Sequence, residues 1–387
     1  MTAYGYARVS SESQDHAGQV ERLRATGCDQ IVAEKVSGKA ALREKLESLR
    51  LGTHVDPNKL TLGDWLEQWL ATVRQEVSPK THERYSELVR GYLIPALGPA
   101  LLSKLSPVAI QAAFNDWAVG GRLDGKAGGL APRTRHHLHR LLKTALTRAV
   151  NDQVLARNPL QAKGPKVERP KMTVLTTEQA TALLDGLRHT RVYWPALLAL
   201  ATGMRWGEVL ALRWWAVDFE RGLVRVTESL EETRPTKGKA TLRFKSTKSG
   251  KARTVTLPRF ALDELRRHKR EQAEQLLALG VRQSAETLVC PREDGEPMVP
   301  ESLTHEFTRL AARVPGLPRV KFHELRHAHA SHLLKTAAHP KIVQERLGHS
   351  TIAITMDLYS HLMDGMETSA ADRIDEAFAA AKSGKGN

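Results

Sequence analysis

The chain of 387 residues carries 58 Lys or Arg and 43 Asp or Glu residues, which gives a formal net charge of +15. So large an excess of positive charge adds nothing to the stability of a fold, and it makes a polyanion the first partner to consider. With 41% hydrophobic and 26% charged residues, the composition excludes a disordered or collagen-like chain. The length suggests about two or three domains, each with its own core.

Cysteine use and hydropathy favour a reducing, aqueous compartment. Cys28 and Cys290 lie far apart and form no C-x-x-C pair, which excludes a disulfide scaffold and a four-thiolate zinc site. The longest apolar run, from Trp194 to Met204, covers 11 residues, whereas a transmembrane helix needs about 20. The first 20 residues show no secretory signal pattern. We therefore expect a cytoplasmic protein without a membrane partner.

Residues 1–50 open with Tyr4-Gly-Tyr-Ala-Arg8-Val-Ser10-Ser11, and Glu34-Lys-Val-Ser-Gly38 follows. This pattern resembles the first strand and helix of serine resolvases, in which the matching serine is the nucleophile and the matching arginine binds phosphate. The resemblance covers about residues 2–45, and no Asp-Arg-x-x-Arg motif follows. A βα fragment cannot bury both faces of its strand or supply the missing arginines, so we predict that Ser10 is inert.

Residues 58–160 are predicted to form a helical domain. Thr61 is expected to cap a first helix, and Ser78 followed by a proline is typical of a second helix start. The longest helix of the segment is predicted from about Arg133 to Val150, because apolar residues recur there in steps of three and one. Residues 161–172, rich in proline and charge, are typical of an interdomain linker.

Basic residues are concentrated in two runs that contain no acid. Six lie within residues 125–151, and nine lie within residues 233–262. Residues 60–170 and 171–387 each carry a net charge of +7, whereas residues 1–50 carry only +1. One such run is often only a solvated face, but two runs in separate segments favour contacts with phosphates. The candidates for these contacts are Arg135, Lys143, Arg148, Lys245 and Lys251.

A second, mostly helical domain is predicted over residues 173–387. Its first helix opens on a capping box at Thr176, and a later apolar helix is expected to stop near Gly203. Alternation of apolar residues predicts short strands over residues 223–227 and 253–257. The expected fold class is therefore mainly α, of the α+β kind. It combines a helical domain with a mostly helical domain that contains a small antiparallel sheet, preceded by a short βα fragment.

Four short motifs in the second domain carry the chemistry. They are Ala201-Thr-Gly-Met-Arg205-Trp-Gly-Glu208, Thr247-Lys248-Ser-Gly-Lys-Ala-Arg253, His323-Glu-Leu-Arg326-His327, and Leu347-Gly-His349 with Tyr359 ten residues later. Transesterification of a phosphodiester needs a nucleophile, positive charge on the non-bridging oxygens, and an acid for the leaving oxygen. Residues of all four motifs can meet these needs.

Cationic side chains of the first three motifs suit a phosphate. Arg205 and Arg326 are planar forks that match phosphate oxygens, and His323 lies on the same helix face as Arg326. Lys248, in a turn between the two predicted strands, can reach into a groove and donate a proton. His349, at a helix end, can hydrogen-bond the same phosphate oxygen or the tyrosine.

The order and spacing of these motifs, over roughly residues 173–365, resemble the signature of the tyrosine recombinase, or phage integrase, family. The helical segment before the linker resembles that family's core-binding domain. The resemblance implies that Tyr359 attacks phosphorus and forms a covalent 3′-phosphotyrosine, with no metal or other cofactor. It also implies that Glu208 supports Arg205 and its helix rather than reacting. We therefore expect a site-specific DNA recombinase that integrates or excises a mobile element.

The resemblance also implies the partners of the chain. These are double-stranded DNA attachment sites, bound by a homotetramer in the bacterial cytosol or nucleoid, with a host DNA-bending protein or an excisionase as an additional partner. Residues 374–381 are predicted to form a helix that docks on a neighbouring protomer. For residues 1–50 three roles stay open: a relic of gene fusion, a docking element, or a replacement for the small arm-binding domain of many integrases.

Two other functions compete with recombination. The segment His323-Glu324-Leu-Arg-His327 is also an H-E-x-x-H sequence, which on a helix directs two imidazoles at zinc and uses the glutamate as general base. Glu345, 18 residues after His327, is a candidate third ligand. A zinc peptidase leaves Arg205 without a role, however, and the longer metal signature fails at Leu333. The second alternative is a DNA-binding accessory protein with a decayed site, although every motif position is filled.

Overall fold

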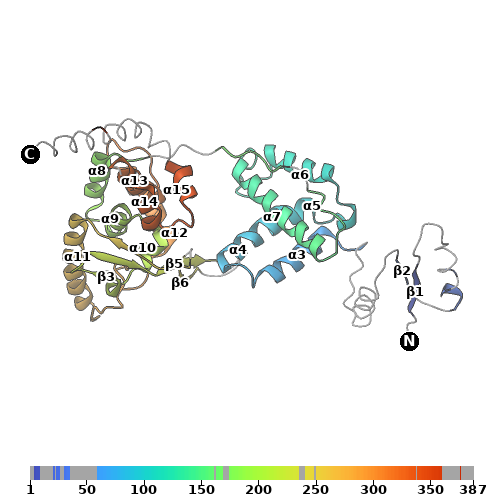
Figure 1. Cartoon of the computed structure of the whole chain (residues 1–387), viewed down its shortest axis with the longest axis horizontal. Coiled ribbons are helices and arrows are strands. Elements are labelled where there is room, and N and C mark those ends of the chain that lie inside the picture. Colours follow the sequence, from blue (N-terminus) through green and yellow to red (C-terminus); the bar gives the residue numbers. More distant parts are fainter. Residues whose placement is uncertain are drawn as a thin grey trace, which may run out of the picture. The chain divides into compact units, whose positions relative to one another are not determined.

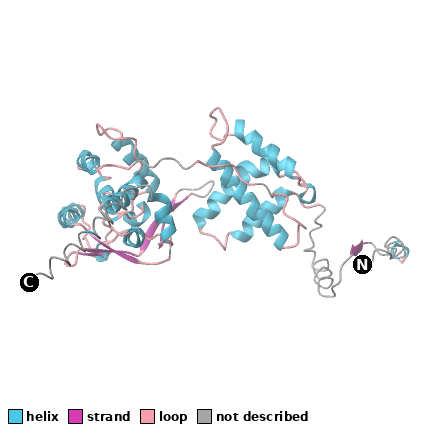
Figure 2. Cartoon of the chain, turned by 45° about the horizontal axis from the view of Figure 1, so that its top comes forward, coloured by secondary structure: helices cyan, strands magenta, loops and turns pink. Residues whose placement is uncertain are grey.

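Two units make up the chain, each described here by itself. The first unit consists of Met1–Ala71 and Leu88–Pro165, and the second consists of Thr72–Glu87 and Lys166–Asn387. The computed structural model describes residues 4–8, 21, 23–26, 30–34, 59–160, 163–168, 174–234, 240–247, 250–336, 338–359 and 375. Helices dominate these residues, and the strands are short (Figure 2). The mainly α fold class expected from the sequence is confirmed.

The N-terminal residues contain two parallel strands, β1 (Tyr4–Arg8) and β2 (Gln30–Glu34), which pair in register from Tyr4 opposite Gln30 to Arg8 opposite Glu34. Helical residues 23–25 lie between them in the sequence. The strand β2 goes beyond the βα fragment that the sequence predicted. Ser10 lies outside the described residues.

The first unit is an assembly of helices (Figure 1). Its buried core is rich in leucine and tryptophan. Thr61 caps its first helix, as predicted, because the Thr61 hydroxyl accepts a hydrogen bond from Asp64 N at 3.1 Å. The indole of Trp65 donates to Ala145 O at 3.0 Å and so joins the first helix to the last one of the unit. The apolar stripe predicted on that last helix is buried. The elements are α3 (Leu62–Val73), a π-helical turn (Val89–Leu93), α5 (Ile94–Leu97), a 3-10 turn (Leu102–Lys104), α6 (Pro107–Val119) and α7 (Pro132–Asn151).

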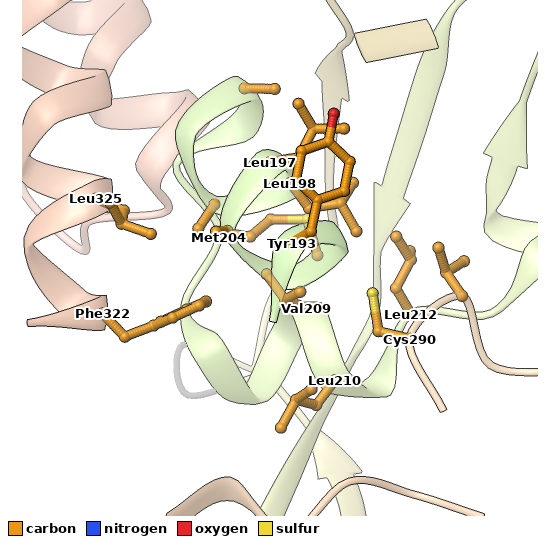
Figure 3. Close-up of a cluster of buried hydrophobic side chains, with 14 of the residues drawn as sticks. Tyr193, Leu197, Leu198, Met204, Val209, Leu210, Leu212, Cys290, Phe322 and Leu325 are labelled. Atoms are coloured by element: carbon orange, nitrogen blue, oxygen red, sulfur yellow. The ribbon is translucent and has the colours of Figure 1, made fainter. Parts of the chain in front are cut away.

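The centre of the second unit is α9 (Tyr193–Thr202), whose side chains are almost all buried. It packs with α10 (Trp206–Ala211) and α13 (Phe322–Lys335) in the core drawn in Figure 3. The helix α8 (Thr177–Leu187) begins at the predicted capping box, and α9 ends where predicted, because Gly203 adopts the left-handed conformation with φ of 70°. These local signals explain why the helices begin and end where they do.

Two small antiparallel sheets complete the second unit. One has the strand order β3 (Val217–Asp218), β4 (Leu223–Val226), β7 (Arg253–Thr256), and the other is the hairpin β5 (Glu228–Thr233) with β6 (Thr241–Ser246). β4 and β7 are the two strands that the sequence predicted. The hairpin was not predicted, because β5 buries Leu230, Glu231 and Glu232 in succession instead of alternating.

The remaining helices of the second unit are α4 (Pro79–Leu88), the 3-10 turn Trp214–Ala216, α11 (Arg259–Ala278), α12 (Pro300–Ala311), α14 (Pro340–Leu347) and α15 (Ile352–Tyr359). α14 packs against α13 and α15 (Figure 1) and also against β7. None of the helices within the described ranges is long and apolar enough to span a membrane. The helix predicted over residues 374–381 lies outside the described residues, apart from Asp375.

Candidate active site

The C-terminal end of α14 collects three arginines. Three successive backbone carbonyls there each accept a hydrogen bond from a different guanidinium group. The pairs are Arg253 Nε with Arg346 O at 2.8 Å, Arg326 Nη2 with Leu347 O at 2.6 Å, and Arg205 Nη2 with Gly348 O at 3.4 Å. The last carbonyls of a helix have no partner within the helix and carry the negative end of its dipole, so they attract cations.

Glu208 is the buried counter-charge of two of these arginines. Its carboxylate is 2% exposed and accepts hydrogen bonds from Arg253 Nη1 and Nη2, at 3.0 and 2.6 Å, and from Arg205 N and Nη1, at 2.8 and 3.0 Å. Burial raises the pKa of Glu208, but the hydrogen bonds and charges of Arg253 and Arg205 outweigh burial and hold this pKa below its usual value. The carboxylate therefore stays ionised and fixes both guanidinium groups.

Arg326 joins the ends of two helices. In addition to its bond at the end of α14, its Nη1 atom donates to Gly203 O at 2.5 Å, at the end of α9. Both helices close on a left-handed glycine, Gly203 with φ of 70° and Gly348 with φ of 62°. The side chain of Arg326 is buried, so this cation is held in place by backbone dipoles rather than by solvent.

His349 connects this cluster to α15. Its Nδ1 atom lies 2.9 Å from the hydroxyl of Thr355, which is buried. Burial, followed by the charges of Arg326 and Arg205, lowers the pKa of His349 to about 4, so the imidazole is neutral at neutral pH. Thr355 lies one helical turn before Tyr359, the last residue of α15. The side chain of Tyr359, like the whole of Lys248, lies outside the described residues.

The H-E-x-x-H residues are not arranged as a zinc site. His323 and His327 lie close on α13, with ring centroids 5.2 Å apart. Glu324, however, caps this helix by accepting a backbone hydrogen bond at 2.5 Å, and Glu345 forms an ion pair of 3.4 Å with a lysine one turn earlier on α14. No group of three or more His, Cys, Asp or Glu side chains within the described ranges is placed to hold a metal ion.

Of the five basic residues predicted to contact phosphates, three have partners inside the chain. Arg135 donates to a backbone carbonyl at 3.2 Å, and Arg148 pairs with an aspartate one turn later at 2.9 Å. Lys245 pairs with the buried carboxylate of Glu231. Lys143 and Lys251 are exposed. These five contacts with DNA stay predictions.

Arg253 is the residue of the cluster that sequence reasoning did not select. The alternation of side chains along β7 could have indicated it. Arg253 lies two residues before Val255, which is buried, so both side chains belong to the inward face of the strand. An inward arginine needs a buried counter-charge. The sequence does not reveal that this counter-charge is Glu208, 45 residues earlier.

Comparisons with protein families identify three matching segments. Residues 173–366 match the phage integrase family, residues 61–118 match the N-terminal SAM-like domain of phage integrases, and residues 3–55 match the N-terminal domain of resolvases. A "Tyrosine recombinase XerC-like" protein of Caldanaerobacter subterraneus subsp. tengcongensis is 28% identical over 391 residues, which cover 96% of each chain. The "ICEBs1 integrase" of Bacillus subtilis is 26% identical over 251 residues, or 64% of this chain and 67% of that protein. Both resemblances predicted from the motifs are confirmed.

Solved structures show the same fold. The integrase of the Tn1549 transposon, in complex with a circular intermediate DNA, is similar at a TM-score of 0.66 and 20% identity, covering 82% of this chain and 100% of that one. A lambda integrase tetramer bound to a Holliday junction is similar at a TM-score of 0.58 and 16% identity, covering 86% of each chain. At these identities the similarity concerns the fold alone.

Proposed function

This chain belongs to the phage integrase family of tyrosine recombinases and carries its catalytic domain, and we propose that it cuts and rejoins DNA through a covalent 3′-phosphotyrosine at Tyr359. One observation carries the proposal. Arg205, Arg326 and His349, which are distant in the sequence, meet at the end of α14, and His349 is bonded to the helix that ends at Tyr359. Such a cluster offers positive charge beside a tyrosine-bearing helix.

The two arginines bind the scissile phosphate in this proposal. Each already has fixed partners, Arg326 at the ends of two helices and Arg205 at Glu208, so their charge is aligned before DNA arrives. A preorganised cation stabilises the charge that develops on the non-bridging oxygens without reorganisation during the reaction. Arg205 is the more accessible of the two, with 24% of its side chain exposed.

The remaining candidates move protons. The Tyr359 oxygen attacks phosphorus and loses its proton, while the bond to the 5′ oxygen breaks and this oxygen leaves as a hydroxyl with a proton from Lys248. His349, neutral in the free protein, accepts the tyrosine proton or donates to a phosphate oxygen, and His323 contacts the same phosphate. Attack by a 5′-hydroxyl then reverses the step, so the DNA is rejoined without a nucleotide cofactor.

The biological substrate that we propose is a pair of double-stranded DNA attachment sites of a mobile element, bound by four copies of the chain. This is supported by the names of the similar proteins, which include an ICEBs1 integrase, a transposon integrase and a lambda integrase tetramer on a Holliday junction. A helix over residues 374–381 would dock on a neighbouring protomer. Deleting residues 366–387 should therefore prevent assembly on DNA, and unchanged assembly would contradict the role of the tail.

A covalent complex tests the reaction itself. Nicked duplexes made from repeats in the DNA that flanks the gene trap the intermediate, which denaturing electrophoresis detects as protein linked to DNA. We expect Tyr359→Phe to abolish the complex and Ser10→Ala to leave it intact, with melting temperatures as the control for folding. The reverse result would overturn the assignment. Stoichiometric zinc in the purified protein with chelator-sensitive activity would instead support the peptidase.

A further inference from the structure

Arg253 has no role in the reaction proposed above, although its side chain is more deeply buried than that of Arg205. Only 9% of it is exposed. Each of its three nitrogen atoms donates to a partner inside the protein: Nε to Arg346 O, and Nη1 and Nη2 to the two oxygens of Glu208. With all three nitrogen atoms engaged in this way, Arg253 can act on the reaction through Glu208 and the end of α14.

We propose that Arg253 is a positioning residue for DNA strand cleavage, which holds Glu208 and the end of α14 so that Arg205 presents its charge to the scissile phosphate. The inference rests on the function proposed above. It concerns a residue that acts through Glu208 and the carbonyl of Arg346.

The carboxylate of Glu208 is shared between Arg253 and Arg205. Oε1 of Glu208 accepts from Nη1 of both arginines at 3.0 Å, whereas Oε2 accepts from Arg253 Nη2 at 2.6 Å and from Arg205 N at 2.8 Å. Both oxygens are thus divided between Arg253 and Arg205, and the carboxylate cannot rotate without breaking bonds to both. Removal of Arg253 leaves a buried carboxylate that only Arg205 can satisfy.

Arg253 also changes the charge balance around Glu208. A pair formed by Arg205 and Glu208 alone is neutral, so little of the arginine charge would remain for a phosphate. With Arg253 the three groups carry one net positive charge, and Arg205 is the arginine that is more exposed to a phosphate. Because Coulomb interactions are strong in a partly buried site, this difference matters for the stabilisation of a phosphate transition state.

Arg253 is also hydrogen-bonded to the end of α14. Arg346 O is the first of the three successive carbonyls that hold the arginines, so Arg253 fixes the turn to which Arg326 and Arg205 are bonded. The turn packs tightly on this guanidinium group: a Cβ atom on Gly348 would lie 3.1 Å from Arg253 Cδ and 3.2 Å from its Nη1. Arg253 therefore ties β7 to both partners of Arg205.

The charge of the substrate separates positioning from mere structural support. We compare the rate of covalent complex formation on two nicked duplexes from the flanking DNA. One carries a normal scissile phosphate. The other carries a methylphosphonate, in which a methyl group replaces one non-bridging oxygen and removes the negative charge. A residue that acts by presenting the charge of Arg205 matters on the first substrate and much less on the second.

Arg253→Gln is the first variant. We expect it to slow cleavage of the phosphate substrate by about 100-fold, the usual cost of one lost stabilising donor, with DNA affinity changed less than about threefold. On the methylphosphonate the deficit should shrink below about tenfold, as it should for Arg205→Ala. Arg225→Gln, an exposed arginine on the neighbouring strand β4, is the matched control and should cleave both substrates like the unmodified protein.

Arg253→Lys keeps the charge but has a single donor atom, which cannot reach both Glu208 oxygens and Arg346 O. It should be slower than the unmodified protein by about tenfold on the phosphate substrate alone, and it decides the matter if Arg253→Gln does not fold. Equal losses on both substrates, or no loss on either, would overturn the inference. A covalent complex that survives Tyr359→Phe would instead refute the proposed function, so the two failures are distinguishable.

Discussion

Replacing Glu208 by alanine removes the carboxylate that holds two arginines. The side chain is almost fully buried, and it accepts four hydrogen bonds from Arg205 and Arg253. Breaking a buried ion pair by removing one partner costs about 3–5 kcal/mol, because the other charge stays buried without compensation. In a unit of this size each kcal/mol lowers the melting temperature by about 2–4 °C. We therefore expect Glu208→Ala to lower the melting temperature by about 6–20 °C.

Scanning calorimetry of the DNA-free protein at pH 7 measures this change. The matched control is Glu286→Ala, because the Glu286 side chain is 74% exposed and should change the free energy of unfolding by less than about 0.5 kcal/mol. The pKa of Glu208 is lower in the folded state than its usual value of 4.5, so its stabilisation is present above that value and is lost as the pH falls through the folded pKa. The difference in melting temperature between Glu208→Ala and the unmodified protein should therefore shrink as the pH is lowered through this range. A melting temperature like that of the control would refute the reasoning.

Three further outcomes follow from the geometry. Burial is the main cause that lowers the pKa of three histidines to about 4. These histidines are His268, His329 and His349. As the pH falls, the histidines of the unfolded chain are protonated before those of the folded protein. The free energy of unfolding, measured with urea, should therefore be greatest above about pH 6.5 and fall by several kcal/mol towards pH 4. A free energy of unfolding that does not change with pH would contradict the burial of the rings. Gly203→Ala should destabilise the protein more than Gly280→Ala. Both glycines have φ near 70°, but only at Gly203 would a Cβ atom lie 2.7 Å from neighbouring side chains. The melting temperatures of the two variants test this. Thr355→Val should slow covalent complex formation by about tenfold because it removes the hydroxyl beside His349 Nδ1, whereas Thr355→Ser should not; equal rates would show that this hydrogen bond is dispensable.

Local signals in the sequence predicted most of the elements that position the site. The capping box at Thr176 and the stop at Gly203 depend on residues within one turn, and the structure has both. β4 and β7 were predicted from alternation and are present. Each of these features is set by neighbours in the sequence, so the residue pattern was sufficient to find them.

The hairpin β5–β6 depends on partners that are not neighbours in the sequence. A carboxylate is rarely buried without a counter-charge, so Glu231 and Glu232 do not indicate a buried strand in the sequence. In the fold, Glu231 accepts from Arg243 at 3.0 Å and Glu232 accepts from Arg234 at 2.8 Å, and both carboxylates are buried. Strand pairing supplies the cation opposite Glu231, since Arg243 lies in register with it on β6. The pattern that hid the strand is therefore a consequence of the pairing itself.

The active-site cluster depends both on local motifs and on contacts between residues that are distant in the sequence. Short motifs identified Arg205, Arg326 and His349 as candidates. The hydrogen-bond acceptors that hold the arginines include backbone carbonyls, which every residue has and which no sequence motif can therefore reveal. Together with Arg253 and Glu208 these groups leave two net positive charges around a neutral imidazole, at the negative end of a helix. Burial lowers the pKa of His349, and so do the charges of Arg326 and Arg205, which a bound phosphate would compensate. Compensation of these charges would therefore raise this pKa.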